Sequence, residues 1–144
     1  MVAVRAVLQR ASRASVTVEG KVTASFDRQG IVALVGVTHG DGPAEAETVA
    51  RKIAELRILD DELSVLDLDA PVIVVSQFTL YADIKKGRRP SWNGAAPGDV
   101  AEPLVDAVVA ALRARGITVG TGVFGAHMDV ELINDGPVTL LVEA

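Results

Sequence analysis

Hydrophobic and polar residues alternate over the N-terminal part of the chain, and the pattern then changes. Residues 3–9 and 15–26 alternate apolar and polar side chains, which indicates strands, and Glu19-Gly20 interrupts the second run as a tight turn. Residues 30–39 (GIVALVGVTH) and 70–82 (APVIVVSQFTLYA) are almost continuously apolar instead. Runs of this kind are expected of strands that are buried on both faces.

Two segments have the spacing of helices. Asp41 can cap the first, Pro43 falls in its first turn, and apolar side chains recur at positions 46, 49, 53 and 56. A second helix is expected from about residue 100 to 115, with Asp99 and Glu102 as a capping box and Gly116 as its stop. Its apolar stripe consists of Leu104, Val108 and Leu112. The C-terminal third returns to strands, so the pattern predicts an α+β fold with two main helices.

Composition narrows this picture to one domain over residues 1–144. A chain of 144 residues with 49% hydrophobic content has enough apolar surface for a single core, and 3% aromatics means a core of Val, Leu, Ile and Ala. No apolar run approaches a membrane span, and the arginine-containing N-terminus does not resemble a signal peptide. The absence of cysteine excludes disulfides and thiolate chemistry and fits a cytoplasmic protein.

Charge is unevenly distributed along the chain. A net charge of −5 argues against a protein that coats nucleic acid by electrostatics alone. However, one loop contains four cations within five residues, namely Lys85, Lys86, Arg88 and Arg89. A basic loop on an acidic body favours local contact with an anion, and a merely solvated loop is the alternative.

The usual catalytic side chains are scarce. The sequence has no G-x-S-x-G elbow and no glycine-rich phosphate loop. His39 and His127 are the only histidines, each followed two residues later by an aspartate. Two such pairs are weak support for a metal site or for a Ser-His-Asp triad. We therefore expect neither a metal nor a cofactor.

The segment Ser76-Gln77-Phe78-Thr79 places polar residues at the end of a buried strand, where hydroxyls and amides need partners. Strand alternation would put Ser76 and Phe78 on one face and Gln77 and Thr79 on the other. The simpler alternative is that the strand emerges into solvent at this point. Thr79 as a nucleophile would need an adjacent base, and the sequence shows none.

The segment Asn134-Asp135-Gly136-Pro137 separates two apolar, strand-like runs. Asn-Asp-Gly alone would be an ordinary hairpin turn, because glycine supplies a positive φ at no steric cost. Proline removes a hydrogen-bond donor where the return strand should begin pairing, which strands tolerate only at an edge, a bulge or a first residue.

Four segments together resemble the D-aminoacyl-tRNA deacylase family: SQFTLYAD (76–83), KGRRPSW (86–92), GVFGAHMDVEL (122–132) and NDGPVT (134–139). Only residues 59–71 depart from the family pattern, being shorter. The resemblance implies a single compact domain with a largely antiparallel, barrel-like sheet. It also implies a cytoplasmic homodimer, without a cofactor, that hydrolyses the ester between a D-amino acid and the 3′-terminal ribose of tRNA and so proofreads chirality in translation.

The resemblance also assigns roles to individual residues. It implies that the Gly136-Pro137 bond is cis and enters the partner subunit's pocket, where it excludes L-amino acids. Such a filter cannot exclude glycine, so glycyl-tRNA is an expected second substrate. The resemblance further implies that the 2′-hydroxyl of the terminal adenosine assists the reaction, with the amides of Phe78 and Thr79 as candidates to stabilise the oxyanion and with Ser76 and Gln77 shaping the pocket.

Further roles follow for the surrounding residues. Arg10 buttresses the Gly-Pro loop, or is an ordinary surface strand residue. Phe124 and Met128 line the adenine site, or belong to the core. Asn134 and Thr139 brace the turn by hydrogen bonds to the backbone. The four cations, Lys85, Lys86, Arg88 and Arg89, contact tRNA phosphates. Two alternatives remain: a conventional esterase with Thr79 or Ser76 as nucleophile, and a non-catalytic RNA-binding dimer.

Overall fold

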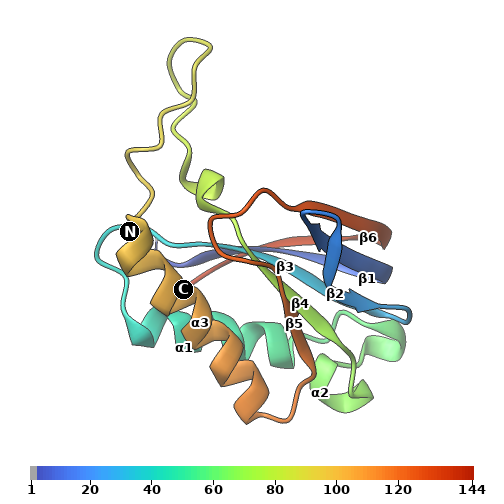
Figure 1. Cartoon of the computed structure of the whole chain (residues 1–144). Helices are drawn as coiled ribbons and strands as arrows, with labels where there is room; N and C mark the ends of the chain where they lie inside the picture. The colour runs from blue at the N-terminus through green and yellow to red at the C-terminus, as the bar shows by residue number, and fades with distance from the viewer. Residues whose placement is uncertain (1–2) are drawn as a thin grey trace.

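A curved sheet carries two helices on one of its faces in the computed structural model, which describes residues 3–144 (Figure 1). In chain order the elements are β1 (Arg5–Val18), β2 (Lys21–Phe26), β3 (Gly30–Gly36), α1 (Pro43–Glu55), η1 (Asp60–Glu62), α2 (Val65–Leu68), β4 (Val72–Ser76), η2 (Phe78–Tyr81), α3 (Gly98–Ala114), β5 (Val119–Thr121) and β6 (Asp129–Glu143). The predicted α+β fold with two main helices is confirmed.

The sheet combines an antiparallel and a parallel part. β1 pairs antiparallel with β2, β3 and β6, whereas β3, β4 and β5 are parallel to one another. The parallel part arises because α1 and α3 carry the chain back across the sheet between successive strands. β5 approaches β2 so closely that a Cβ on Gly120 would lie 2.7 Å from Cβ of Ala24, so the sheet nearly closes into a barrel.

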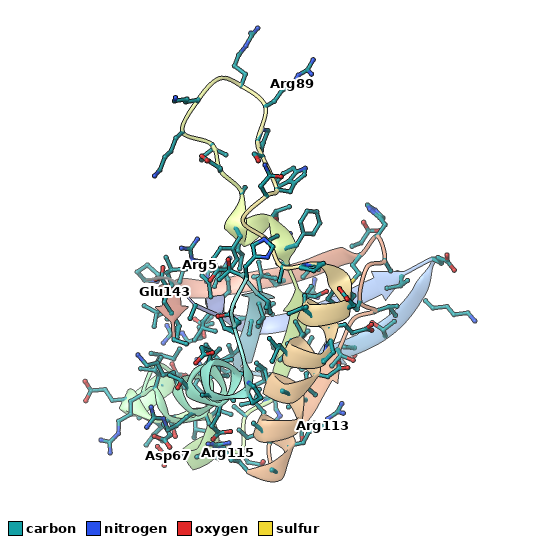
Figure 2. The ribbon with its side chains drawn as sticks, turned by 90° about the vertical axis from the view of Figure 1, so that its left-hand side faces the viewer. Arg5, Asp67, Arg89, Arg113, Arg115 and Glu143 are labelled. Atoms are coloured by element: carbon teal, nitrogen blue, oxygen red, sulfur yellow. The ribbon has the colours of Figure 1, made fainter. Side chains whose placement is uncertain are left out.

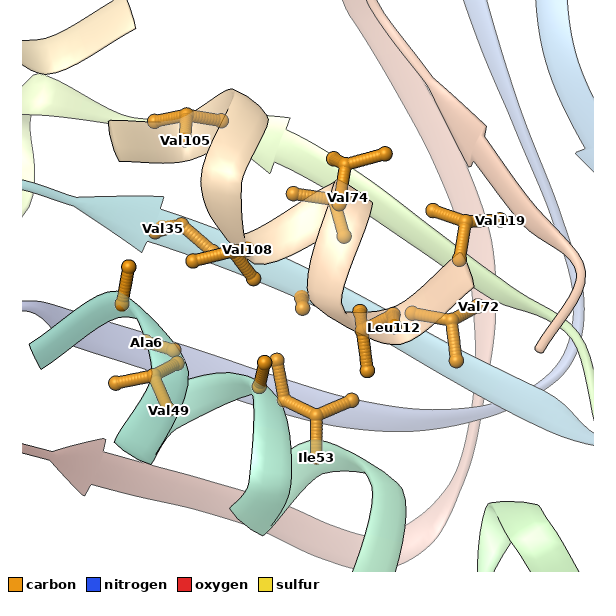
Figure 3. Close-up of a cluster of buried hydrophobic side chains, with 14 of the residues drawn as sticks. Ala6, Val35, Val49, Ile53, Val72, Val74, Val105, Val108, Leu112 and Val119 are labelled. Atoms are coloured by element: carbon orange, nitrogen blue, oxygen red, sulfur yellow. The ribbon is translucent and has the colours of Figure 1, made fainter. Parts of the chain in front are cut away.

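Most of the core lies between this sheet and the helices. The buried side chains of α1 and α3 meet those of β3, β4 and β5, and Val, Leu, Ile and Ala supply this layer, as the composition predicts (Figure 3). The labelled members are Ala6, Val35, Val49, Ile53, Val72, Val74, Val105, Val108, Leu112 and Val119. A smaller cluster fills the concave face of the sheet, where Val16, Val32, Ile73 and Val75 are buried.

The helix caps differ from those predicted. Gly42, not Asp41, is the N-cap of α1, and the Glu45 carboxylate accepts the Gly42 N–H at 2.7 Å. The Asp41 carboxylate instead accepts the Thr38 N–H at 2.7 Å, closing the turn after β3. α3 begins at Gly98 after Pro97, so the predicted Asp99–Glu102 capping box does not form because both residues already lie inside the helix.

Both continuous apolar runs are shorter as strands than predicted. β3 ends at Gly36, and β4 ends at Ser76. The residues after Ser76 turn into the short helix η2, after which residues 83–91 project from the body of the molecule (Figures 1 and 2). The chain then returns to the body, where the Ala96 N–H donates to the Val37 carbonyl. Within residues 3–144 no helix is long and apolar enough to cross a membrane.

Candidate active site

A cavity of about 500 Å³ opens beside the C-terminal end of β4. Ser76, Gln77 and Phe78 at the end of β4 line it, and so do residues 124–128 from the segment between β5 and β6. Val35 and Val37 from the end of β3 and Ala101 and Val105 from α3 supply apolar wall. The cavity therefore lies at the carboxyl ends of the parallel strands, which is where open α/β sheets commonly bind ligands.

The turn from Gln77 to Tyr81 is held against β3 by backbone contacts. The Gln77 N–H donates to the Val35 carbonyl at 2.8 Å, which continues the ladder for one residue beyond β4. Gly36 then permits a close approach, because a Cβ there would lie 2.9 Å from the Gln77 carbonyl oxygen and 3.0 Å from Cβ of Leu80. This approach replaces the strand alternation predicted for residues 76–79, so their predicted two-face arrangement is wrong.

The first residues of η2 leave two backbone donors free. Within residues 3–144, the N–H groups of Phe78 and Thr79 donate to no protein acceptor, as is usual for the first turn of a helix. Adjacent free N–H groups beside a cavity are the arrangement that stabilises an oxyanion during acyl transfer. Phe78 and Thr79 thus present two free N–H donors and no ionisable side chain.

The Thr79 side chain has a partner that is not a base. The Gln77 amide Nε2 donates to Thr79 Oγ1 at 2.6 Å. His127 lines the cavity, but its side chain is 93% exposed and its nearest charged partner is Asp129 at 3.5 Å. No hydrogen bond within residues 3–144 joins His127 to Ser76 or Thr79, and the described residues contain no cluster of three metal-ligating side chains.

Aromatic and thioether side chains line the cavity. Phe124 and Met128 come from the segment between β5 and β6. Phe78 and Trp92 also line it, with ring centroids 5.5 Å apart and planes at 75°. Flat apolar rings of this kind are suited to stacking on bases.

Beneath η2, a cation supports the turn. Arg5 Nη1 donates to the Leu80 carbonyl at 2.8 Å, its guanidinium lies 4.7 Å from the centroid of the Tyr81 ring, and its Nε lies 3.2 Å from Glu143 Oε1. Burial raises the pKa of Tyr81 to about 12. The pKa of Asp41, on the adjoining turn, is also raised by burial, which outweighs the N–H that Thr38 donates.

The Gly-Pro loop lies in the middle of β6, away from the cavity of the same chain. The Gly136–Pro137 peptide bond is cis, and both residues are exposed. Asn134 Nδ2 donates to the carbonyls of Arg10 and Val138, at 3.0 and 3.2 Å. Thr139 Oγ1 lies 2.5 Å from Gln9 Oε1, so this residue contacts a side chain rather than the backbone that was predicted.

Arg10 fixes this loop to a second segment. Its side chain is 16% exposed, and its Nε donates to the Asp135 carbonyl at 2.7 Å. Its Nη1 donates to the Ile58 carbonyl at 3.0 Å. Gln29 adds a parallel link, because its Nε2 donates to the Asp135 carboxylate at 2.7 Å and its Oε1 accepts the Asp60 N–H at 3.0 Å.

The four cations all lie on the projecting segment. An antiparallel bridge between Asp83 and Ser91 closes this segment, here called the basic arm (residues 83–91), and Arg89 lies at its outer end (Figure 2). Lys85, Lys86, Arg88 and Arg89 are exposed, and none forms an ion pair within residues 3–144.

The structure thus divides the predicted site residues into three groups. The cavity gathers Ser76, Gln77, Phe78, Phe124 and Met128, with Thr79 beside it. The loop on β6 gathers Arg10, Asn134, Gly136, Pro137 and Thr139, and none of these lines the cavity of the same chain. The basic arm forms the third group.

Sequence reasoning missed three contributors to the cavity. Trp92 and His127 line it, and Arg5 supports the turn that borders it. Trp92 is the only tryptophan of the chain and directly follows the basic loop, which was the available signal. No signal in the sequence pointed to Arg5, because its contact with Leu80 joins residues 75 positions apart.

Comparisons with known proteins give concordant matches over nearly the whole chain. Residues 7–143 match the model of a family described as D-Tyr-tRNA(Tyr) deacylase. A D-aminoacyl-tRNA deacylase of Kineococcus radiotolerans is 63% identical over 97% of this chain and 99% of its own, and one of Beutenbergia cavernae is 66% identical over the same shares. A solved structure described as c-Myc DNA Unwinding Element Binding Protein is 38% identical, with a TM-score of 0.88 over 97% of this chain and 98% of that one.

Proposed function

This chain belongs to the D-Tyr-tRNA(Tyr) deacylase family, and we propose that it is a hydrolase that cleaves the ester bond of D-aminoacyl-tRNA, releasing the free amino acid and tRNA. The observation that carries this proposal is the identity of 63–66% with curated D-aminoacyl-tRNA deacylases over 97% of the chain. In this role the protein proofreads chirality in translation, in the cytoplasm.

Catalysis is proposed to proceed without a side-chain nucleophile. The ester carbonyl binds at the turn, where the N–H groups of Phe78 and Thr79 stabilise the oxyanion that forms. The 2′-hydroxyl of the terminal adenosine assists attack on the ester, while Ser76 and Gln77 shape the pocket around it. Two free amides and the Gln77–Thr79 hydrogen bond support this division of roles, because they leave Thr79 without a base.

Chiral selection is proposed to come from the partner subunit of a homodimer. Gly136 and Pro137 would enter the partner's cavity, with Arg10, Asn134 and Thr139 holding the loop that carries them. The exposure of both residues and their distance from the cavity of the same chain support this arrangement. Fixed backbone oxygens would leave room for hydrogen, but not for a side chain, on one side of the substrate α-carbon.

The required selectivity favours rigid backbone over side-chain fit. A thousandfold rejection of L-amino acids needs about 4 kcal/mol. A methylene group more or less in a hydrophobic pocket changes binding by only about 1–3 kcal/mol. A steric clash with a rigid element has no such limit. The same filter admits glycine, which has no side chain, and so glycyl-tRNA is proposed as a second substrate.

The tRNA itself is proposed to bind along two further surfaces. Phe124 and Met128 hold the terminal adenine, consistent with their place in the cavity wall. Lys85, Lys86, Arg88 and Arg89 contact phosphates of the acceptor stem. Their exposure and lack of ion-pair partners within residues 3–144 support this role on a chain with a net charge of −5.

The test is a paired hydrolysis assay on D- and L-tyrosyl-tRNA, with glycyl-tRNA as a third substrate. Rapid release of D-tyrosine, release of glycine, and retention of the L-ester are the expected results. Equal rates on the D- and L-esters would contradict the proposed filter, and absence of hydrolysis of all three would contradict the activity.

A conventional esterase with Thr79 or Ser76 as nucleophile is the enzymatic alternative. Thr79→Ala and a substrate with a 2′-deoxy terminal adenosine separate the two mechanisms. RNA-assisted catalysis predicts a modest loss with Thr79→Ala and a large loss with the 2′-deoxy substrate. A side-chain nucleophile predicts the reverse.

Nucleic-acid binding without catalysis is the second alternative, and the name of the 38% identical solved structure favours it. It predicts that the protein retains D-aminoacyl-tRNA without releasing amino acid. The paired hydrolysis assay decides between binding alone and cleavage.

A further inference from the structure

We propose that Trp92 and Phe78 form a stacking platform for the penultimate nucleobase of the acceptor end, the nucleotide that precedes the terminal adenosine. This inference rests on the proposed function, and it adds a binding subsite outside the reaction centre. The occupant is an unpaired base of a single-stranded RNA end.

The two rings are more exposed than large aromatic side chains usually are. Phe78 is 55% exposed and Trp92 is 46% exposed, and they contact each other edge to face. Both also line the cavity, so the pair lies at its mouth. Adjacent exposed apolar groups at the mouth of a pocket mark a surface that a ligand covers.

Charge around this platform identifies the ligand. Trp92 directly follows the basic arm, whose four cations have no ion-pair partner within residues 3–144. Aromatic rings for the bases beside cations for the phosphates are how proteins bind single-stranded nucleic acid. The whole chain has 19 acidic side chains against 14 basic ones, so its net charge does not attract a polyanion and this concentration of four cations is a local site for one.

The geometry of the cavity sets the order of the nucleotides. One of the two free N–H groups of the turn belongs to Phe78, whose ring forms half of the platform. Phe124 and Met128, from the segment between β5 and β6, line the same cavity. An RNA end whose last base rests on Phe124 and whose ester reaches the turn must leave through the mouth, where it meets the two rings and then the basic arm.

The experiment compares two substrates that differ only in the RNA beyond the last nucleoside. D-tyrosyl-tRNA carries the penultimate nucleotide, whereas D-tyrosyl-adenosine lacks it. Wild-type protein, Trp92→Ala and Trp92→Phe are assayed on both. Ile84→Ala is the matched control, because Ile84 is an exposed apolar side chain (71%) on the basic arm without a ring.

The expected result is an effect confined to one substrate. Trp92→Ala raises the ratio of KM for D-tyrosyl-tRNA to KM for D-tyrosyl-adenosine about 5- to 150-fold, the range for removal of one base-stacking ring. Trp92→Phe retains most of the affinity because it retains a ring, and Ile84→Ala behaves like wild type. A tRNA with an abasic penultimate position abolishes the difference between wild type and Trp92→Ala.

Other outcomes overturn the inference. Equal losses on both substrates would mean that Trp92 contacts the amino acid or the adenosine. A change in sedimentation of Trp92→Ala would mean that the platform is covered by a second copy of the chain. Unchanged KM for D-tyrosyl-tRNA in Trp92→Ala overturns the inference while leaving the proposed function intact. A wild-type protein inert toward both esters overturns both.

Discussion

Tyr81 and Arg5 form the support beneath the turn from Gln77 to Tyr81. The Tyr81 hydroxyl is buried and has no hydrogen-bond partner within residues 3–144, while the Arg5 guanidinium lies over the ring. An unpartnered buried hydroxyl is unfavourable, so the ring is the useful part of this side chain. Its contact with Arg5 keeps the guanidinium in place to hold the Leu80 carbonyl.

Tyr81→Phe is therefore expected to change stability in a pH-dependent way. The folded-state pKa of about 12 exceeds the unfolded value near 10, so the unfolded chain loses its proton first and stability falls as pH rises from 10 to 12. Because phenylalanine does not titrate, Tyr81→Phe does not show this fall in stability between pH 10 and 12. At pH 7 its free energy of unfolding is equal to that of wild type, or higher by up to about 1 kcal/mol.

Urea unfolding at pH 7 and at several values between pH 9 and 12 measures both effects. Parallel stability curves for the two proteins above pH 10 would show that Tyr81 titrates alike in the folded and unfolded states.

At this scale, the sequence predicted the residues that form motifs and missed those that act through distant contacts. Ser76, Gln77, Phe78, Phe124 and Met128 were predicted, and they border one cavity. Arg5 was missed because its partner Leu80 is remote in sequence and contributes only a backbone carbonyl. A backbone acceptor leaves no trace in side-chain composition.

The contact of η2 and the preceding Gln77 with the end of β3 fixes the position of the turn. Gly36 leaves no room for a side chain against the Gln77 carbonyl, and this contact determines where the free amides of Phe78 and Thr79 lie. The precision of an oxyanion site depends on donors that do not move during the reaction. A methyl group at position 36 therefore acts on catalysis without touching the substrate.

Gly36→Ala is expected to lower kcat for D-tyrosyl-tRNA hydrolysis by about 10- to 100-fold, because the turn must shift to relieve a 2.9 Å contact. KM changes less, since Trp92, Phe124 and Met128 do not belong to the turn. Gly42→Ala is the matched control, because a Cβ there meets its nearest atom at 3.6 Å. Steady-state kinetics with thermal unfolding of both variants gives the comparison, and unchanged kcat in Gly36→Ala would contradict it.

Element boundaries were less predictable than the elements themselves. The continuous apolar run 70–82 predicted one strand, but a short helix replaces its second half, since Leu80 donates its N–H to Gln77 and Ala82 donates to Thr79. The parallel pairing of β3, β4 and β5 was also missed. Pairing direction depends on how helices cross the sheet, which a local pattern does not record.

At the scale of the whole molecule, four cations are concentrated on the projecting basic arm of a chain with a net charge of −5, and Figure 2 labels Arg89 on that arm. Replacing Lys85, Lys86, Arg88 and Arg89 by alanine is expected to weaken tRNA binding and to reduce the salt dependence of KM, by about 0.9 in the log–log slope for each duplex phosphate that the arm no longer neutralises. Hydrolysis of D-tyrosyl-adenosine stays at the wild-type rate. KM measured over a series of salt concentrations checks this, and an unchanged slope would contradict phosphate binding by the arm.

The separation of the cavity from the Gly-Pro loop makes the quaternary structure testable by mixing subunits. Gly36→Ala impairs the cavity, and a Gly136→Ala/Pro137→Ala double variant impairs the loop. If the loop of one subunit completes the cavity of the other, each mixed dimer contains one intact site out of two. Random assortment of an equal mixture makes about half of the dimers mixed, so about a quarter of all sites regain both activity and selection against L-esters. Each variant alone lacks such a site.

The mixture is measured by denaturing and refolding the two variants together, with each variant refolded alone as the reference. Activity equal to the average of the two separate preparations would indicate that each chain forms its site unaided. The sequence contains no residue pattern that predicts a dimer, so the dimer was expected only from the family resemblance.

Arg10 and Gln29 connect the Gly-Pro loop to residues 58–60, a segment that does not line the cavity. If the loop selects handedness as proposed, a laboratory selection for relaxed handedness is expected to accumulate substitutions around Ile58 and Asp60, which alter how the loop is held and leave the amides of Phe78 and Thr79 unchanged. Substitutions in residues 58–60, after α1, are thus a route by which this fold could be adapted to new ester substrates.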